Sequence, residues 1–324
     1  MNASDAHGPL PSPACSEPNP PTTARTKPGL ARAYFLAARP KTLTAALIPV
    51  LVATALAHAD GRFDGTATVL CALFACAMQV AANYVNDLYD HLRGTDRTDR
   101  LGPRRACAQG WVSTRGMKRA TVLTIAVASA IGLALLAHVH ERMPWGGWEL
   151  VGIGVACVVL AVVYTTYLSY RGWGDALVLI GFGFIPVAGT YYVQTATLTA
   201  DVWVAALVCG LCIDTLLTLN NYRDREQDRL SGKLTLVVRL GGERGRWLYA
   251  ALGVAAVAVC GWWLYTGRLT PMEMLWAPGI YLYLHAVTCI RLWQAQTAAQ
   301  YNKVLGQTSR NMLLLALLLA AALI

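Results

Sequence analysis

Long stretches without charged residues are the feature that most restricts what this chain can fold into. Only Asp214 is charged within residues 202–221, and no residue is charged within residues 312–324. A run of about 20 mostly apolar residues is the length of a helix that crosses a bilayer. The charged share of 14% also lies well below the quarter or so of soluble domains. The sequence therefore predicts an all-α, polytopic membrane protein.

Apolar runs that end at charged residues or at Gly and Pro predict nine membrane-crossing helices. The shortest separation is at residues 170–174, where only a few residues divide two spans. The helices are expected to begin near Leu43, Ala67, Ala120, Leu150, Ala176, Val202, Leu248, Met272 and Met312.

Basic residues separate strongly between the two ends of these predicted helices. With nine crossings, 24 of the 27 lysines and arginines fall on one side, and only Arg62, Arg142 and Arg268 fall on the other. Cytoplasmic loops of membrane proteins collect Lys and Arg. The pattern therefore predicts a cytoplasmic amino terminus and an external carboxyl terminus.

The amino-terminal segment differs in composition from the rest of the chain. Residues 1–29 are rich in Pro, Ser, Thr and Ala, and they lack the basic and apolar regions of a signal peptide. We predict a disordered cytoplasmic tail over residues 1–29 and one membrane domain over residues 30–324.

The formal net charge of +9 does not indicate nucleic acid. The basic residues crowd membrane-adjacent loops that are also full of acids, and the sequence contains no nucleic-acid-binding module. Membrane lipids with anionic headgroups and an anionic substrate explain the charge better.

A first acidic cluster lies where the second predicted helix leaves the membrane. Asn83, Asp87 and Asp90 are spaced i, i+4, i+7, which places them on one face of a helix. Asn86 precedes Asp87 in the same segment. The oxygens of these side chains are therefore expected to converge.

A second cluster repeats the pattern at the end of the sixth predicted helix. Asn220, Asp224 and Asp228 are each four residues apart and share a face. The Asn-x-x-x-Asp unit recurs with an offset of 137 residues, four helices after the first. An even number of crossings returns the chain to the same side, so both clusters are expected to face one cavity.

Paired carboxylate clusters suit one type of ligand in particular. Magnesium prefers hard oxygen ligands and usually takes one or two carboxylates together with water and phosphate oxygens. The Arg and Lys residues between the acids would neutralise the remaining phosphate charge. The alternative is that these acids and bases simply pair at helix ends, but the duplicated Asn-x-x-x-Asp favours a magnesium-diphosphate site.

Three sequence blocks carry a resemblance to a known family. They are Arg39-Pro-Lys-Thr-Leu43, then Asn86-Asp87-x-x-Asp90 running on to Gly94-Thr-Asp96, then Asn220-Asn221-x-Arg223-Asp224-x-x-x-Asp228 running on to Gly241. The chain resembles the UbiA superfamily of intramembrane aromatic prenyltransferases. Within it, the chain is most similar to the 1,4-dihydroxy-2-naphthoate polyprenyltransferases of menaquinone synthesis.

The resemblance implies nine helices around a central cavity with cytoplasmic cap loops. It implies catalytic roles for Asp87, Asp90, Asp224 and Asp228, and magnesium ligands at Asn83, Asp87, Asp90, Asp96, Asp224 and Asp228. Diphosphate or substrate contacts are expected from Asn83, Asn86, Lys41, Arg105, Asn220, Asn221, Arg223, Lys233 and Arg239. Anchoring to lipid headgroups is the alternative for Lys41, Arg105, Lys233 and Arg239. Many members carry an Asp where this chain has Gly94, whereas the naphthoate branch shares the Gly and the offset Asp96.

The implied reaction transfers a polyprenyl group from a prenyl diphosphate to 1,4-dihydroxy-2-naphthoate, with loss of CO2 and diphosphate, and gives demethylmenaquinol. Three alternatives remain open at this point. The acceptor could be 4-hydroxybenzoate, homogentisate or another phenol. The chain could be a membrane terpene cyclase or diphosphate hydrolase, or a transporter, although both clusters lie on one predicted side.

Further ionisable residues lie outside the two clusters. Asp214 lies inside the sixth predicted helix and Asp175 opens the fifth. A carboxylate within a membrane span is a functional candidate, so either could orient or deprotonate the aromatic acceptor, although helix packing is an alternative for Asp214. His138 and His140 could bind a metal, but a solvated external loop explains them better.

Overall fold

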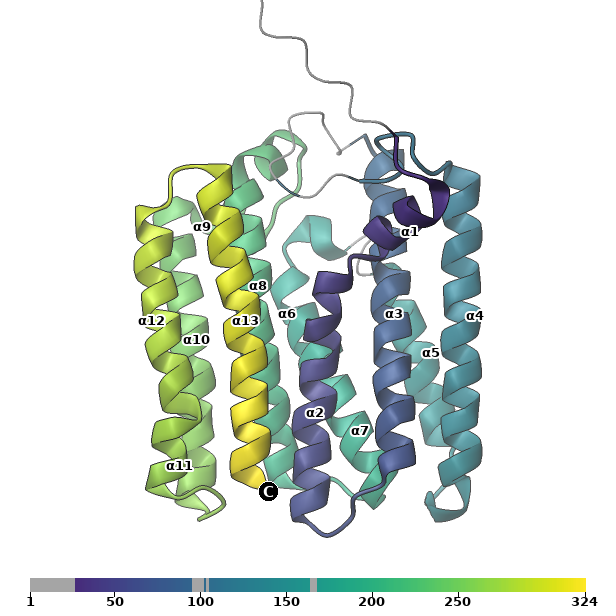
Figure 1. Ribbon diagram of the computed structural model, residues 1–324, viewed down its shortest axis with the longest axis vertical. Coiled ribbons are helices and arrows are strands. Elements are labelled where there is room, and N and C mark those ends of the chain that lie inside the picture. Colours follow the sequence, from purple (N-terminus) through teal and green to yellow (C-terminus); the bar gives the residue numbers. More distant parts are fainter. Residues whose placement is uncertain (1–26, 95–101, 103–104, 164–167) are drawn as a thin grey trace, which may run out of the picture.

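The computed structural model describes residues 27–94, 102, 105–163 and 168–324, and every regular element within them is a helix (Figure 1). Asp96 and most of the predicted tail lie outside these residues. The elements are α1 (Leu30–Ala38), η1 (Pro40–Thr42), α2 (Leu43–Ala59), α3 (Gly65–Leu92), α4 (Thr114–Val139), η2 (His140–Arg142), α5 (Trp148–Val163), η4 (Ser169–Arg171), α6 (Gly174–Val178), η5 (Leu179–Phe184), α7 (Ile185–Thr195), α8 (Ala200–Leu230), α9 (Leu236–Leu240), α10 (Gly242–Tyr265), α11 (Pro271–Trp276), α12 (Pro278–Gln294) and α13 (Ala298–Leu323).

The long helices run side by side along one direction, as expected for a membrane bundle (Figure 1). Among the described residues, seven helical segments are long and apolar enough to cross a membrane, and the apolar α5 is shorter. The α11–α12 pair corresponds to the remaining predicted crossing. The all-α membrane fold is therefore confirmed, with nine as an approximate count of crossings.

Helix α8 forms the centre of the bundle. It packs against α2, α7, α10, α13 and η5. Two glycines bring η5 close to it, because a Cβ on Gly183 would lie 2.5 Å from the Ala206 carbonyl oxygen and one on Gly210 would lie 2.9 Å from Leu179 Cδ2. Small residues at such crossings let helix backbones approach closely in a membrane. The close approach holds α6 and η5 against α8.

The start of the last helix was predicted wrongly. The expectation was a helix beginning near Met312, but α13 begins at Ala298. Thr297 caps it, since its hydroxyl accepts a hydrogen bond from the Gln300 backbone N–H while the Gln300 side chain accepts from the Thr297 backbone N–H. The first turns of α13 carry polar residues on their exposed face, so they do not form the continuous apolar run on which the prediction relied. Their buried face is lined by Tyr301, Val304, Leu305 and Thr308.

Both aspartate clusters lie at the same end of the bundle. Helices α3 and α8 each carry their cluster in their last turns, and both helices end on the side of the bundle where α1 lies. The carboxyl terminus lies at the opposite end (Figure 1). The predicted return of the chain to one side is therefore present in the fold.

Candidate active site

Two buried residues of the first cluster, Asn83 and Asp87, form hydrogen bonds between the end of α3 and neighbouring segments. Asp87 accepts hydrogen bonds from the backbone N–H groups of Ala106 and Cys107, each at 2.9 Å. The Asn83 amide donates to the Ala38 carbonyl and to the Thr42 hydroxyl, each at 2.9 Å. These bonds hold residues 105–107 and the α1–η1 corner over the cluster.

Asp90 has polar partners from two different segments. It accepts a hydrogen bond from Arg105 Nη2 at 2.5 Å and another from the Tyr170 hydroxyl at 3.1 Å. The Arg93 guanidinium lies over the ring of the same tyrosine, 4.2 Å from its centroid. A charge-assisted pair of this kind holds the carboxylate in one orientation.

Asp224 is held by the residue that precedes it. The Arg223 guanidinium donates to both carboxylate oxygens at 2.7 Å, and its third nitrogen donates to Asn302 Oδ1 at 2.9 Å. A two-pronged contact with a carboxylate is the geometry that arginine also uses for phosphate oxygens. Asn220 donates to the Leu216 carbonyl, one turn earlier in α8, at 3.0 Å.

Helix η4, which contains Tyr170 and Arg171, lies between the two clusters and contacts both sides. Asp228 lies 3.6 Å from Lys233 Nζ, and the next residue, Leu234, donates its backbone N–H to the Tyr170 carbonyl at 3.0 Å. Tyr170 in turn donates its hydroxyl to Asp90. Arg239 Nη2 also donates a hydrogen bond to the Arg171 carbonyl of η4, at 2.5 Å. Helix η4 therefore connects the end of α3 with the loop that follows α8.

The predicted site residues fall into three groups. Arg105 and Asp90 pair beside α3, and the pairs Arg223–Asp224 and Lys233–Asp228 lie at the end of α8. Lys41 is exposed in η1, Asn86 is half-buried, Asn221 is buried in α8, and Arg239 contacts backbone. The position of Asp96 is not described.

Three residues that contact the clusters were not predicted from the sequence. They are Thr42, Tyr170 and Asn302. Thr42 is part of the first matched block, which was a usable signal. Tyr170 lies in the short break between two predicted spans and Asn302 in a segment taken for a loop. Neither has a local pattern that indicates its contact.

The donor set at this end suits magnesium by its chemistry. It consists of carboxylate and amide oxygens, the hard ligands that magnesium prefers. In the part of the chain that the structure describes, no three His, Cys, Asp or Glu side chains are grouped closely enough to hold a metal. The two clusters supply suitable ligands from separate helices rather than one preformed cage.

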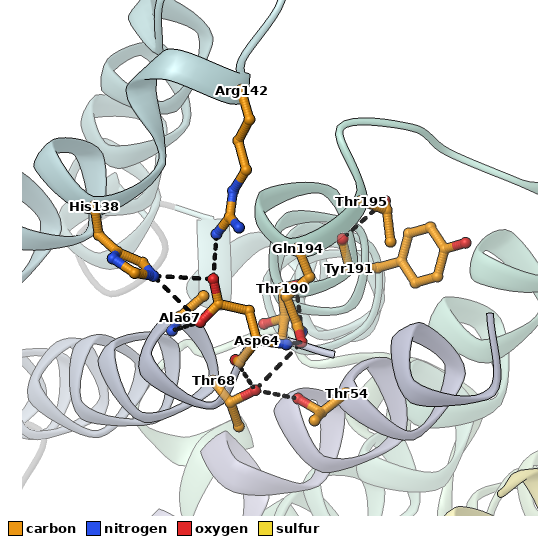
Figure 2. A network of polar contacts seen from close by, with 10 residues as sticks. All are labelled: Thr54, Asp64, Ala67, Thr68, His138, Arg142, Thr190, Tyr191, Gln194 and Thr195. Carbon is orange, nitrogen blue, oxygen red and sulfur yellow. Dashed lines mark hydrogen bonds and ion pairs between the residues drawn. The ribbon is translucent and has the colours of Figure 1, made fainter. Parts of the chain in front are cut away.

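A second polar network surrounds Asp64 at the start of α3 (Figure 2), which is the opposite end of this helix from the first cluster. Asp64 caps α3 by accepting from the Ala67 backbone N–H at 2.8 Å, and it accepts from Arg142 at 2.5 Å and contacts His138 Nε2 at 2.9 Å. Burial raises the pKa of Asp64, but these three partners together outweigh burial and lower it to about 2. The contact between His138 and Asp64 joins α4 to the start of α3.

A sequence model described as the UbiA prenyltransferase family matches residues 46–323. A 1,4-dihydroxy-2-naphthoate octaprenyltransferase from Haemophilus influenzae is 32% identical over 300 residues, which cover 90% of this chain and 95% of the relative. The Escherichia coli protein of the same name is 36% identical, over 76% of this chain and 79% of the relative. These matches confirm the family resemblance that the three sequence blocks indicated.

Solved structures share the fold. A UbiA homolog from Archaeoglobus fulgidus bound to GPP and Mg2+ aligns with a TM-score of 0.62 and 14% identity, over 89% of this chain and 99% of the homolog. The apo structure of a UbiA homolog from Aeropyrum pernix K1 aligns with a TM-score of 0.63 and 16% identity, over 86% and 96%.

Proposed function

Because this chain belongs to the UbiA prenyltransferase family, we propose that it transfers a polyprenyl group from a prenyl diphosphate to 1,4-dihydroxy-2-naphthoate. CO2 and diphosphate leave, and demethylmenaquinol is the product. The observation that carries the proposal is the connection of two Asn-x-x-x-Asp clusters through Tyr170 at one end of the bundle. The names of the bacterial relatives, which match over most of their length, support the naphthoate acceptor.

Magnesium is the proposed metal. Its ligands would come from Asn83, Asp87, Asp90, Asp96, Asp224 and Asp228, and an Archaeoglobus homolog of this fold is described as bound to GPP and Mg2+. Bound magnesium would stabilise the negative charge of the departing diphosphate. Asp90, Asp224 and Asp228 present carboxylate oxygens at the helix ends, whereas Asp87 already holds the backbone of residues 105–107.

The basic residues have a defined role in this proposal. Arg105, Arg223 and Lys233 each lie against a carboxylate of the clusters, so a cation is placed in advance beside Asp90, Asp224 and Asp228. When the diphosphate arrives, Arg105, Arg223 and Lys233 would donate hydrogen bonds to its oxygens. The further proposed substrate contacts are Lys41, Arg239, Asn86, Asn220 and Asn221. Charge-assisted hydrogen bonds stabilise the charge that grows as the C–O bond breaks.

The reaction then proceeds in a shielded environment. Ionisation of the C–O bond leaves an allylic cation, and the electron-rich ring carbon that bears the carboxylate attacks it. The C–C bond to the carboxylate breaks, CO2 leaves, and its electron pair restores the aromatic ring. Apolar surroundings protect the cation from water. The prenyl chain can remain in the bilayer throughout.

The proposed location is the cytoplasmic membrane of a bacterium, with the amino terminus and both clusters on the cytoplasmic side. Supporting this orientation, the predicted nine-crossing topology assigns 24 of the 27 basic residues to the side of the clusters. The tail over residues 1–29 would then be cytoplasmic, ahead of the membrane domain at residues 30–324.

Mass spectrometry of lipid products tests the function. Purified protein in nanodiscs would receive magnesium, an all-trans polyprenyl diphosphate and equal amounts of 1,4-dihydroxy-2-naphthoate, 4-hydroxybenzoate and homogentisate. The expected result is prenylated naphthoquinol with release of CO2. Prenylation of another acid alone would replace the naphthoate acceptor. A cyclised or hydrolysed prenyl product that forms equally without acceptor would overturn the transferase proposal.

A further inference from the structure

Two carboxylates approach each other deeper in the bundle than the aspartate clusters. Asp175 lies in the first turn of α6 and Asp214 lies within α8, where it is 2% exposed. Both oxygens of Asp175 and Oδ1 of Asp214 are buried without a hydrogen-bond partner in the described part of the chain. The hydroxyl of the fully buried Thr218, which faces Asp175, likewise lacks a bond of normal geometry.

The fold places these three side chains together for a physical reason. Asp214 and Thr218 are one turn apart on the same face of α8. The close packing of η5 on α8 continues upward to Gly174, where an added Cβ would lie 3.5 Å from Leu217 Cδ2. Asp175 therefore faces the turn of α8 that carries Asp214 and Thr218, and the two carboxylates interact electrostatically.

The lack of partners distinguishes this pair from the other acids of the bundle. Asp87 accepts two backbone N–H groups, Asp64 pairs with Arg142, and Asp60 pairs with Arg268. A buried carboxylate without a donor or a cation is costly, and within a membrane span it marks a functional position. The arrangement indicates a ligand that supplies hydrogen-bond donors.

The position and charge of the pair select the ligand. Asp214 precedes Asp224 by ten residues, about 15 Å along the helix axis, and Asp175 follows the Asp90 partner Tyr170 by five residues. The pair therefore lies below the proposed diphosphate site, toward the middle of the bundle. Carboxylates repel a diphosphate, and a prenyl chain has no donors, but a hydroxylated aromatic ring has them.

We propose that Asp175, Asp214 and Thr218 form the subsite that accepts hydrogen bonds from the hydroxyl groups of the aromatic acceptor. This assignment rests on the proposed prenyl transfer. A carboxylate of the pair takes the proton from an acceptor hydroxyl as the ring carbon bonds to the prenyl cation, so that oxygen becomes a carbonyl. When the bond to CO2 breaks, the electron pair returns to the ring and the oxygen regains its proton. No proton is consumed overall.

Binding measurements with matched acceptors test the subsite. The variants are Asp175→Asn, Asp214→Asn and Thr218→Val, with Asp201→Asn as the control, because Asp201 lies at the outer end of α8 and pairs with Arg268. Isothermal calorimetry would compare 1,4-dihydroxy-2-naphthoate with its 1-hydroxy and 4-hydroxy analogues. Magnesium-dependent binding of an unreactive prenyl thiolodiphosphate would be measured on each variant.

The expected result is a loss of about 10- to 100-fold in dihydroxynaphthoate affinity for the two Asp→Asn variants, because a hydrogen bond to a charged group is lost. The affinity for the analogue that lacks the contacted hydroxyl should fall less than about 3-fold in these variants. The substitution and the missing hydroxyl remove the same interaction, so their effects do not add. Thiolodiphosphate binding should stay unchanged, as should every measurement on the control.

Three results would overturn the subsite: unchanged acceptor affinity, equal losses for all three naphthoates, or loss of thiolodiphosphate binding in the Asp→Asn variants. The first two would show that the pair is structural, with a shared proton or water. If product analysis instead identifies a different hydroxylated acid, the same comparison with that acid and its dehydroxylated analogue still tests the subsite. Failure of the naphthoate assignment is thereby separated from failure of the subsite.

Discussion

The hydroxyl of Tyr170 donates to Asp90 Oδ1 at 3.1 Å, across 80 residues of sequence. The carbonyl of the same tyrosine accepts from Leu234, next to the Lys233 that pairs with Asp228. One residue between two membrane spans thus sets the positions of both aspartate clusters. These contacts support the proposal that the clusters of the two helices form one site.

Replacing Tyr170 with Phe removes the bond to Asp90 and keeps the ring that Arg93 covers. A typical hydrogen bond contributes about 1 kcal/mol, so we expect the KM for the prenyl diphosphate to rise about 5-fold. Steady-state kinetics in nanodiscs would measure this, with Tyr265→Phe as the control because Tyr265 is 84% exposed. An unchanged KM would contradict the linking role of Tyr170.

Asp224→Asn is expected to lower prenyl transfer at least 100-fold, since a proposed magnesium ligand becomes a neutral amide. Size-exclusion chromatography should still give a folded protein. Glu226→Gln is the matched control in the same turn of α8, because that side chain is 72% exposed. The magnesium concentration for half-maximal activity should rise in Asp224→Asn alone, and wild-type activity in Asp224→Asn would refute the metal role.

Stability at low pH should depend on Asp64. Its pKa is about 2 in the fold against 3.8 for an unperturbed aspartate, so its interactions stabilise the protein above pH 4 and are lost as the pH falls toward 2. The difference corresponds to about 2 kcal/mol. Thermal unfolding of the wild type and Asp64→Asn should therefore differ at pH 6 and converge near pH 2. If the two unfolding temperatures differ by the same amount at every pH, the charge of Asp64 does not contribute to stability.

Gly183→Ala should destabilise the bundle. The new methyl would lie 2.5 Å from the Ala206 carbonyl oxygen, so η5 must move away from α8, at a cost of about 1–3 kcal/mol. Gly189→Ala is the control, since its Cβ would meet nothing within 4 Å. A lower Tm for Gly183→Ala only, measured in detergent, is the expected outcome; equal Tm values would show that the contact is easily relieved.

Much of the fold could be predicted because membrane spans carry a local signal. Apolar runs indicated most helices, and the parity of crossings placed both clusters at one end. The apolar run does not extend to the start of α13, because Lys303 and Arg310 lie within the helix. Its polar face conceals the helix, and only the buried face of Tyr301, Val304 and Leu305 reveals it.

The sequence by itself determined the helices and the faces on which the aspartates lie, because helical periodicity and apolar length depend on neighbouring residues. Only the tertiary structure decided the partners of two carboxylates: the backbone N–H groups of Ala106 and Cys107 for Asp87, and Arg105 and Tyr170 for Asp90. It also decided that Asp175 and Asp214 meet without a donor in the described part of the chain. Such contacts join residues far apart in the chain, and they depend on how closely helices pack, which no local pattern encodes.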